Sequence, residues 1–210
     1  LGRNDLKGRK VLVIGGRGEE PVDDMRVISN RSSGLMSLEM AVAAHRRGAE
    51  VEMWMGAHDV RVPGYIPMRR FQTLRDLMDM VETADHDVVL VPAALPDYSP
   101  QRRPGKIDSS APTLDIRLDR LPKMLPSLVR AGRTVVGFKA ESGVDDETLE
   151  ERSRSRLREY GLDLVVANDV KVAGDDMTRA LLVDDKGATE VRGSKRHVAE
   201  RILDRVSGKG

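Results

Sequence analysis

Val11-Leu12-Val13-Ile14-Gly15-Gly16 is the stretch that decides the fold, because a run of apolar residues ends there at a glycine pair. A short continuous apolar run bounded by turn residues is typical of a buried strand. A polar segment follows and ends in Arg26-Val27-Ile28-Ser29-Asn30-Arg31-Ser32-Ser33-Gly34. Beyond Gly34, apolar residues recur at helical spacing, as in Met36, Met40, Ala43 and Ala44. The sequence therefore predicts a strand, a long polar loop and a helix start.

The loop before this helix has the residue types of an anion site. A helix N-terminus offers free backbone N–H groups and a positive dipole end. Ser32, Ser33 and Gly34 are small residues, which allow a phosphate to approach the backbone. The Asn30 amide can donate to a carbonyl or phosphoryl oxygen. The glycine pair alone also fits a tight turn.

Outward from this unit, apolar runs alternate with helical patterns. Such alternation predicts an α/β fold with a doubly wound, mostly parallel, Rossmann-like sheet. The expected strands are Val11–Ile14, Glu50–Met55, Val88–Val91, Thr134–Phe138 and Leu164–Ala167. The expected helices are Ser33–Arg47, Leu74–Thr83, Leu121–Ala131 and Asp146–Tyr160.

Two segments depart from this alternation. After residue 170, Ala180–Val183 and Thr189–Val191 predict a β-hairpin, and a helix over Ser194–Val206 follows, so that the chain ends in a hairpin/helix appendage. Residues 99–118 are rich in proline and basic residues and are expected to form a mobile loop leading into an extra strand. A solvated basic loop is the alternative. We expect a single domain over residues 10–206, with residues 1–9 as a linker or a remnant of cloning.

Composition limits the function classes. The 210 residues carry a formal net charge of +1, so a general nucleic-acid-binding surface is not expected. The absence of cysteine excludes disulfides and thiolate metal sites. No apolar run has the length of a membrane span and no secretory signal is visible, so we expect no membrane partner and a cytoplasmic protein.

The histidines lack metal-ligand spacing. Acidic pairs such as Asp23-Asp24 fit turns or caps, or a Mg²⁺ ion held with nucleotide phosphates.

The segment from Arg26 to Gly34 resembles the loop of the phosphopantothenate–cysteine ligase family, the second half of a bifunctional coenzyme A biosynthesis protein of bacteria and archaea. Three further segments match the family in order. They are Pro92-Ala-Ala-Leu-Pro-Asp-Tyr98, Val136-Gly-Phe-Lys-Ala-Glu141 and Leu162-Asp-Leu-Val-Val-Ala-Asn-Asp-Val170. The resemblance covers roughly Lys10 to Val206.

The resemblance implies a reaction and its partners. The carboxylate of 4′-phosphopantothenate would attack the α-phosphate of CTP, giving an acyl-cytidylate and pyrophosphate. The amine of L-cysteine would then displace CMP. Mg²⁺ is expected with CTP, and no flavin is expected in this chain. A flavin-dependent decarboxylase precedes this half in many relatives. The family's dimers imply a homodimer formed through the hairpin over residues 171–192.

The resemblance also implies site residues. Asn30 would hold the acyl-cytidylate near its carbonyl. Lys106 matches the first lysine of the family's mobile Lys-Ile-Lys-Lys loop and would act in forming the acyl-cytidylate. Ala93, Ala94 and Asp97 fall in the segment that contacts the base, and Phe138 is either a ligand contact or core filler. The resemblance implies a phosphate cradle formed by Gly15, Gly16, Ser32, Ser33 and Gly34. The chain departs from the family at Asp108, Leu35 and residues 15–20, which affects the phosphate contacts.

Other functions stay open at this point. A Rossmann-like NAD(P)-binding oxidoreductase shares the fold class, although neither G-x-G-x-x-G nor a P-loop motif occurs in the chain. A non-catalytic paralogue that binds nucleotide is the second alternative. Metal ligands and the higher oligomeric state do not follow from the sequence.

Overall fold

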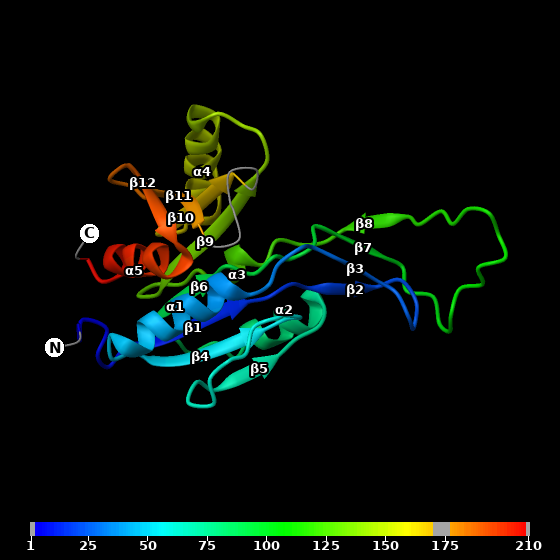
Figure 1. Cartoon of the computed structure of the whole chain (residues 1–210), viewed down its shortest axis with the longest axis horizontal. Helices are drawn as coiled ribbons and strands as arrows, with labels where there is room; N and C mark the ends of the chain where they lie inside the picture. Colours follow the sequence, from blue (N-terminus) through cyan, green and yellow to red (C-terminus); the bar gives the residue numbers. More distant parts are fainter. Residues whose placement is uncertain (1–2, 170–176, 209–210) are drawn as a thin grey trace.

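The computed structural model describes residues 3–169 and 177–208, and its centre is an 8-stranded sheet. The strand order across the sheet is β12-β11-β10-β9-β6-β1-β4-β5 (Figure 1). The bounds of its strands are β1 Lys10–Gly15, β4 Glu50–Met55, β5 Met68–Arg70, β6 Val88–Val91, β9 Thr134–Glu141, β10 Leu164–Asp169, β11 Met177–Val183 and β12 Ala188–Ser194. In this order, every pair of neighbours from β10 through β9, β6, β1 and β4 to β5 is parallel. This confirms the expected doubly wound sheet.

Both faces of the sheet are buried, because successive side chains of a strand point to opposite sides. Val11 and Val13 pack into one apolar layer with residues of α1 (Leu35–Arg46) and α5 (Lys195–Val206). Leu12 and Ile14 pack into the other layer with residues of α2 (Leu74–Val81), α3 (Leu125–Leu128) and α4 (Asp146–Tyr160). The continuous apolar run thus follows from burial on two faces.

Local capping sets several helix ends. Thr73 and Asp76 form a reciprocal capping box at the start of α2. Asp145 and Ser194 accept N-cap hydrogen bonds at the starts of α4 and α5. Gly161 adopts φ 66° at the end of α4, a left-handed conformation that glycine takes without strain.

The prediction of a helix over Leu121–Ala131 is wrong. Only Leu125–Leu128 is helical, and Val129 is already extended. Pro122 and Pro126 explain the difference. A proline lacks an N–H donor and disfavours helical geometry in the residue before it. Pro126 is tolerated because it lies in the first turn.

The C-terminal hairpin is confirmed, but it is not a separate appendage. Strand β11 pairs antiparallel with both β10 and β12, so the hairpin continues the central sheet. Helix α5 packs beside α1 on the same face. Residues 171–176 of the expected dimerisation hairpin lie outside the described residues.

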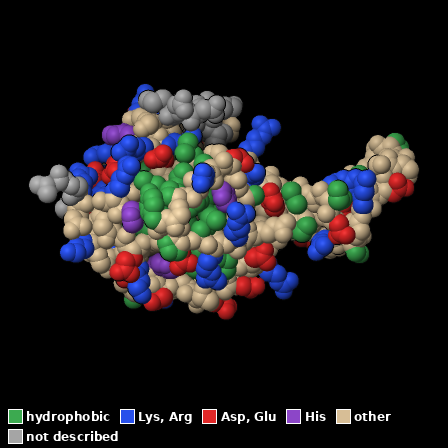
Figure 2. Space-filling view, turned by 60° about the horizontal axis from the view of Figure 1, so that its bottom comes forward, with side chains coloured by type: hydrophobic (Ala, Val, Ile, Leu, Met, Phe, Trp, Pro, Cys, Tyr) green, Lys and Arg blue, Asp and Glu red, His purple; other side chains and the backbone are tan. Residues whose placement is uncertain are grey.

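The sequence did not reveal an arm that projects from the body, made of residues 19–29 and 98–120 (Figures 1 and 2). It contains two short antiparallel pairs, β2 (Glu19–Pro21) with β3 (Val27–Ser29) and β7 (Tyr98–Pro100) with β8 (Leu118–Arg120). Strands of three residues are too short for a periodic signal, which is why they were missed. Only the extra strand after the basic loop was expected.

The first described residues pack against the body instead of forming a free linker. Leu6 is fully buried. Arg47, whose side chain is 2% exposed, donates its Nε to Asp5 Oδ1 at 2.9 Å and its Nη1 to Asp204 Oδ1 at 2.9 Å. One buried guanidinium therefore joins the N-terminal segment, α1 and α5. Across residues 3–169 and 177–208, no helix is both long and apolar enough to cross a membrane.

Candidate nucleotide-binding site

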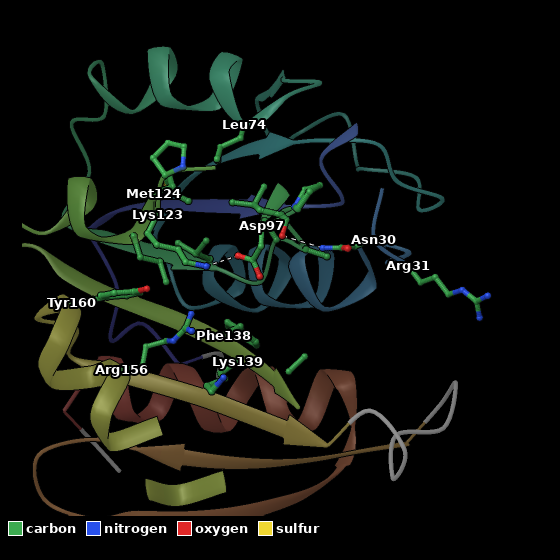
Figure 3. A pocket seen from close by; sticks show the side chains of 18 residues that line it. Asn30, Arg31, Leu74, Asp97, Lys123, Met124, Phe138, Lys139, Arg156 and Tyr160 are labelled. Atoms are coloured by element: carbon green, nitrogen blue, oxygen red, sulfur yellow. Dashed lines mark hydrogen bonds and ion pairs between the residues drawn. The ribbon is translucent and has the colours of Figure 1, made fainter. Parts of the chain in front are cut away.

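A cavity of about 370 Å³ lies at the carboxyl ends of β6 and β9 (Figure 3). Strand order reverses beside it, since β1 is followed in the chain by β4 on one side and later by β6 on the other. Ligands of open α/β sheets bind in the crevice at such a switch point. Its volume is that of a small-molecule site.

The cavity gathers residues from several separate parts of the chain. The segment after β6 supplies Ala93, Ala94 and Asp97, and Phe138 comes from β9. Asn30 enters from the loop after β3. Structure thus brings together the expected residues Asn30, Ala93, Ala94, Asp97 and Phe138, although they are distant in sequence.

Asn30 is held at the cavity wall by a hydrogen bond. Its Nδ2 donates to the carbonyl oxygen of Leu95 at 3.0 Å. The neighbouring Ser29 hydroxyl donates to the Gly18 carbonyl at 2.7 Å. These contacts fix the end of β3 against Gly18 and against the segment after β6, so that Asn30 lies at the cavity wall (Figure 3).

The lining is positively charged. Its cations are Arg31, Lys123, Lys139 and Arg156, whereas among the described lining residues Asp97 alone carries a carboxylate. Lys123 forms an ion pair with Asp97. The Arg31 side chain points away from the cavity in Figure 3, whereas Lys123, Lys139 and Arg156 lie around the cavity. An excess of cations suits a ligand with several phosphate charges.

The end of β9 carries a second charged group. Lys139 Nζ lies 2.7 Å from Glu141 Oε1, and Arg152 Nη1 lies 3.1 Å from Glu141 Oε2. The Lys139 ammonium, followed by the Arg152 guanidinium, lowers the pKa of Glu141. Lys139 therefore has an anionic partner beside the cavity.

Sequence reasoning missed the contribution of α4. The Arg156 guanidinium carbon lies 5.1 Å from the centre of the Tyr160 ring, a cation–π distance. Both residues line the cavity. Their spacing of four residues places them on one helix face, and this was the available signal. Lys123 was missed because its segment was taken for a helix.

The expected phosphate cradle lies next to the cavity but does not line it. A Cβ built on Gly15 would meet Ser37 Oγ at 2.2 Å, and one on Gly16, at φ +74°, would meet the Ala57 carbonyl at 2.7 Å. Close packing therefore explains the glycine pair without a ligand. Gly34 caps α1 at φ 81°. The residues Gly15, Gly16, Ser32, Ser33 and Gly34 are absent from the described cavity lining, and their phosphate role remains a prediction.

Lys106 lies on the arm and not at the cavity. Its neighbours Gly105 and Ile107 bond to Asp24 and Asp23, at the far end of the β2–β3 hairpin. Arg26 and Asn30 on that hairpin are separated by about 13 Å of extended chain at 3.3 Å per residue. The structure therefore separates Lys106 from Asn30 of the same chain.

Metal donors are few around the cavity. Within the described part of the chain, no group of three or more His, Asp or Glu side chains is placed to hold a metal ion. Mg²⁺ commonly uses one or two carboxylates together with substrate phosphates. The Asp97 carboxylate in the cavity fits that limited role.

Comparison with known proteins places this arrangement in a family. The family model described as "DNA/pantothenate metabolism flavoprotein C-terminal domain" matches residues 6–209. The chain belongs to this family. The resemblance inferred from four sequence motifs is thereby confirmed.

Members of this domain family with similar sequences include two archaeal proteins named coenzyme A biosynthesis bifunctional protein CoaBC. The Methanocaldococcus jannaschii protein is 34% identical over 211 residues, which cover 97% of this chain and 52% of that protein. The Thermococcus kodakarensis protein is 33% identical over 210 residues, covering 96% and 51%. The chain spans about half the length of these relatives.

Three solved structures are similar to this chain in fold. The C-terminal domain of a CoaBC protein is 26% identical with a TM-score of 0.81, covering 98% of this chain and 97% of that one. A DNA/pantothenate metabolism flavoprotein from Streptococcus pneumoniae has a TM-score of 0.88 at 22% identity, covering 97% and 100%. A Cab2 mutant in complex with phosphopantothenate-cysteine has a TM-score of 0.77 at 18% identity, covering 96% and 86%.

Proposed function

We propose that this chain is a CTP-dependent ligase that joins 4′-phosphopantothenate to L-cysteine through an acyl-cytidylate, in coenzyme A biosynthesis. The observation that carries the proposal is the cavity at the switch point, where Asn30, Ala93, Ala94, Asp97 and Phe138 meet within a cationic lining. The CoaBC relatives, named for coenzyme A biosynthesis, support it.

The cavity suits the first half-reaction. An oxygen of the phosphopantothenate carboxylate forms a bond to the α-phosphorus of CTP, and the bond to the leaving pyrophosphate breaks. Catalysis of such a displacement consists of positioning and of neutralising charge on the phosphate oxygens. Lys123, Lys139 and Arg156 supply cations around the cavity. Mg²⁺ bound at Asp97 would add charge neutralisation.

The second half-reaction needs donors for an oxyanion. The cysteine amine attacks the acyl carbon, CMP departs with the electron pair of the broken bond, and the amine loses a proton to solvent. Charge develops on the carbonyl oxygen, where hydrogen-bond donors matter most. The Asn30 amide faces the cavity, and the second N–H of its Nδ2 would supply one such donor while the first stays on Leu95.

Nucleotide choice would come from backbone groups. The residues from Ala93 to Asp97 line the cavity, and backbone groups of this segment that are not bonded within the protein would meet a base edge there. Cytosine and adenine differ in the order of donors and acceptors on that edge. Phe138 offers its ring to the same space.

A homodimer would complete the site with Lys106. The arm holds this lysine away from the cavity of its own chain and exposes Met25, Val27, Tyr98, Leu114, Ile116 and Leu118. Exposed apolar side chains on a projecting segment favour burial against a partner. We infer that the arm of each copy reaches the other. The relatives' bifunctional name also favours a second catalytic half in the whole protein, for which a flavin-dependent decarboxylase is our candidate.

The test is pyrophosphate release from CTP or ATP with phosphopantothenate, followed by cysteine addition. Rapid release with CTP and formation of phosphopantothenoylcysteine are expected. Equal or faster turnover with ATP would refute the CTP assignment. Binding of NAD(P)H without any pyrophosphate release would instead favour an oxidoreductase, and CTP binding without release a non-catalytic paralogue.

A further inference from the structure

The turn that carries Lys106 is attached to the tip of the β2–β3 hairpin by two adjacent carboxylates. The Ile107 amide donates to Asp23 Oδ2 at 3.0 Å, and the Gly105 amide donates to Asp24 Oδ2 at 3.1 Å. The backbone on both sides of Lys106 is therefore held by side chains that lie more than 80 residues earlier in the chain.

Further contacts make the attachment two-sided. The Asp24 amide donates to the Gly105 carbonyl at 3.2 Å, and the Arg103 amide donates to the Val22 carbonyl at 2.9 Å. Arg102 Nη2 donates to Asp24 Oδ1 at 2.9 Å. Gly105 has φ +76°, a conformation that lets the turn reverse direction without strain. The turn is thus bound to the hairpin through main chain and side chains together.

The Asp23 carboxylate is buried and fully used in hydrogen bonds around the Lys106 turn and the hairpin tip. Its side chain is fully buried, and it also accepts the amides of Met25 and Arg26 at 2.8 Å each. Arg26 pairs with it and points its Nη1 at the Ile107 carbonyl, 3.4 Å away. The oxygens of Asp23 are occupied by donors, which disfavours the alternative that the acidic pair holds Mg²⁺. If Asp23 only capped the turn of its own hairpin, it would have no need to accept the Ile107 amide as well.

The same hairpin connects this turn to the cavity. Strand β3 runs from the hairpin tip to Asn30, whose amide is bonded to Leu95 at the cavity wall. The space-filling view shows the arm as a narrow projection with charged side chains among apolar ones (Figure 2). A lysine on a projection needs such attachment, because an unattached loop would spread its ammonium over many positions.

We propose that Asp23 and Asp24 are positioning residues for Lys106, holding its turn so that the ammonium is presented to the nucleotide in the cavity of the second copy during acyl-cytidylate formation. The proposal rests on the proposed ligase function. Misplacement of a catalytic group by about 1 Å can cost on the order of 100-fold in rate. Loss of either carboxylate should therefore slow the first half-reaction and leave the second unchanged.

The experiment compares Asp23→Asn and Asp24→Asn with wild type in single-turnover pyrophosphate release, without cysteine. A decrease of about 10- to 100-fold is expected, with an unchanged rate of cysteine transfer from preformed intermediate. Asp79→Asn, which removes the same charge from an exposed position on α2, off the arm, should keep the wild-type rate. In a Lys106→Ala background, Asp23→Asn should cause no further decrease, because it acts through the lysine.

Several results would overturn the proposal: an additive effect in the Lys106→Ala background, an equal loss in both half-reactions, or a wild-type rate in both aspartate variants. Asp24 is partly exposed, so its variant serves if Asp23→Asn does not fold.

Hydrogen exchange of the Gly105 and Ile107 amides separates this proposal from the ligase function. If wild type released no pyrophosphate, the ligase function would fail, whereas loss of amide protection in the aspartate variants would still support the attachment. Unchanged protection would refute it.

Discussion

Asn30 donates its side-chain amide to the carbonyl of Leu95 across a sequence separation of 65 residues, at 3.0 Å. The bond joins the two chain segments that leave the sheet on either side of its switch point. It therefore holds the loop after β3 against the segment after β6 at the cavity wall, where the proposed function would place the acyl-cytidylate carbonyl. The Asn30 Nδ2 carries a second N–H, which can donate to a ligand oxygen while the first stays on the Leu95 carbonyl.

Replacing Asn30 by Ala should impair transfer to cysteine. The variant loses a donor for the developing oxyanion, and loss of one such donor typically costs on the order of 100- to 1,000-fold in rate. Rapid-quench analysis with CTP, phosphopantothenate and cysteine measures it. Pyrophosphate release in the same variant is the internal control and should continue. Equal loss of both steps would contradict the assigned role.

Replacing Lys106 by Ala should impair formation of the intermediate. The lysine supplies charge to the triphosphate during attack, so little acyl-cytidylate should accumulate in its absence. Quenched samples without cysteine provide the measurement. Lys186→Ala, in the exposed turn between β11 and β12, removes a lysine from a remote position and should behave as wild type. Normal accumulation in Lys106→Ala would exclude its role.

Weakening the arm should dissociate the proposed homodimer. Ile116→Ser and Leu118→Ser, at residues 40% and 41% exposed, remove apolar surface that a partner would cover. Light scattering at micromolar concentration should show monomers for the double variant and dimers for wild type. Val129→Ser, at a residue 37% exposed and off the arm, is the matched control. The hairpin predicted from the family resemblance would be favoured if the arm variant stayed dimeric, and a monomeric wild type would refute the dimer.

Replacing Arg47 by Met should destabilise the fold strongly. The change leaves the carboxylates of Asp5 and Asp204 buried without this partner. Removing one member of a buried ion-pair network typically costs about 3–5 kcal/mol. Urea denaturation measures the free energy of unfolding. Arg46→Met, one residue earlier and exposed, should change it little.

Acid should weaken the same network. The Arg47 guanidinium lowers the pKa of Asp5 from 3.8 to about 2 in the folded chain. A lowered folded-state pKa contributes stability above the unfolded value, near pH 4, and that stability is lost as pH falls toward 2. Urea midpoints should therefore drop between pH 4 and 2, and less steeply in Asp5→Asn. An identical pH profile in that variant would show that Asp5 does not contribute.

Sequence reasoning could name residues of the cavity only where they fall inside recognisable motifs, and their roles stay predictions. Asn30 and Ala93 to Asp97 belong to contiguous strings, and both strings reach the cavity. Lys123 and Arg156 lie outside any string whose chemistry is visible, because a cation on a helix or loop is usually solvated. They became candidates only when the chain placed them beside one cavity.

The sequence by itself determined the sheet and its two helical layers, because apolar runs and helical periodicity report burial on each face locally. It also determined the family, through four ordered motifs. Only the tertiary structure decided that the hairpin over β11 and β12 extends the central sheet, that residues 19–29 and 98–120 form an arm, and that Lys106 lies away from Asn30. These features depend on pairing between segments far apart in the chain, and no local pattern encodes which strand edge will meet another.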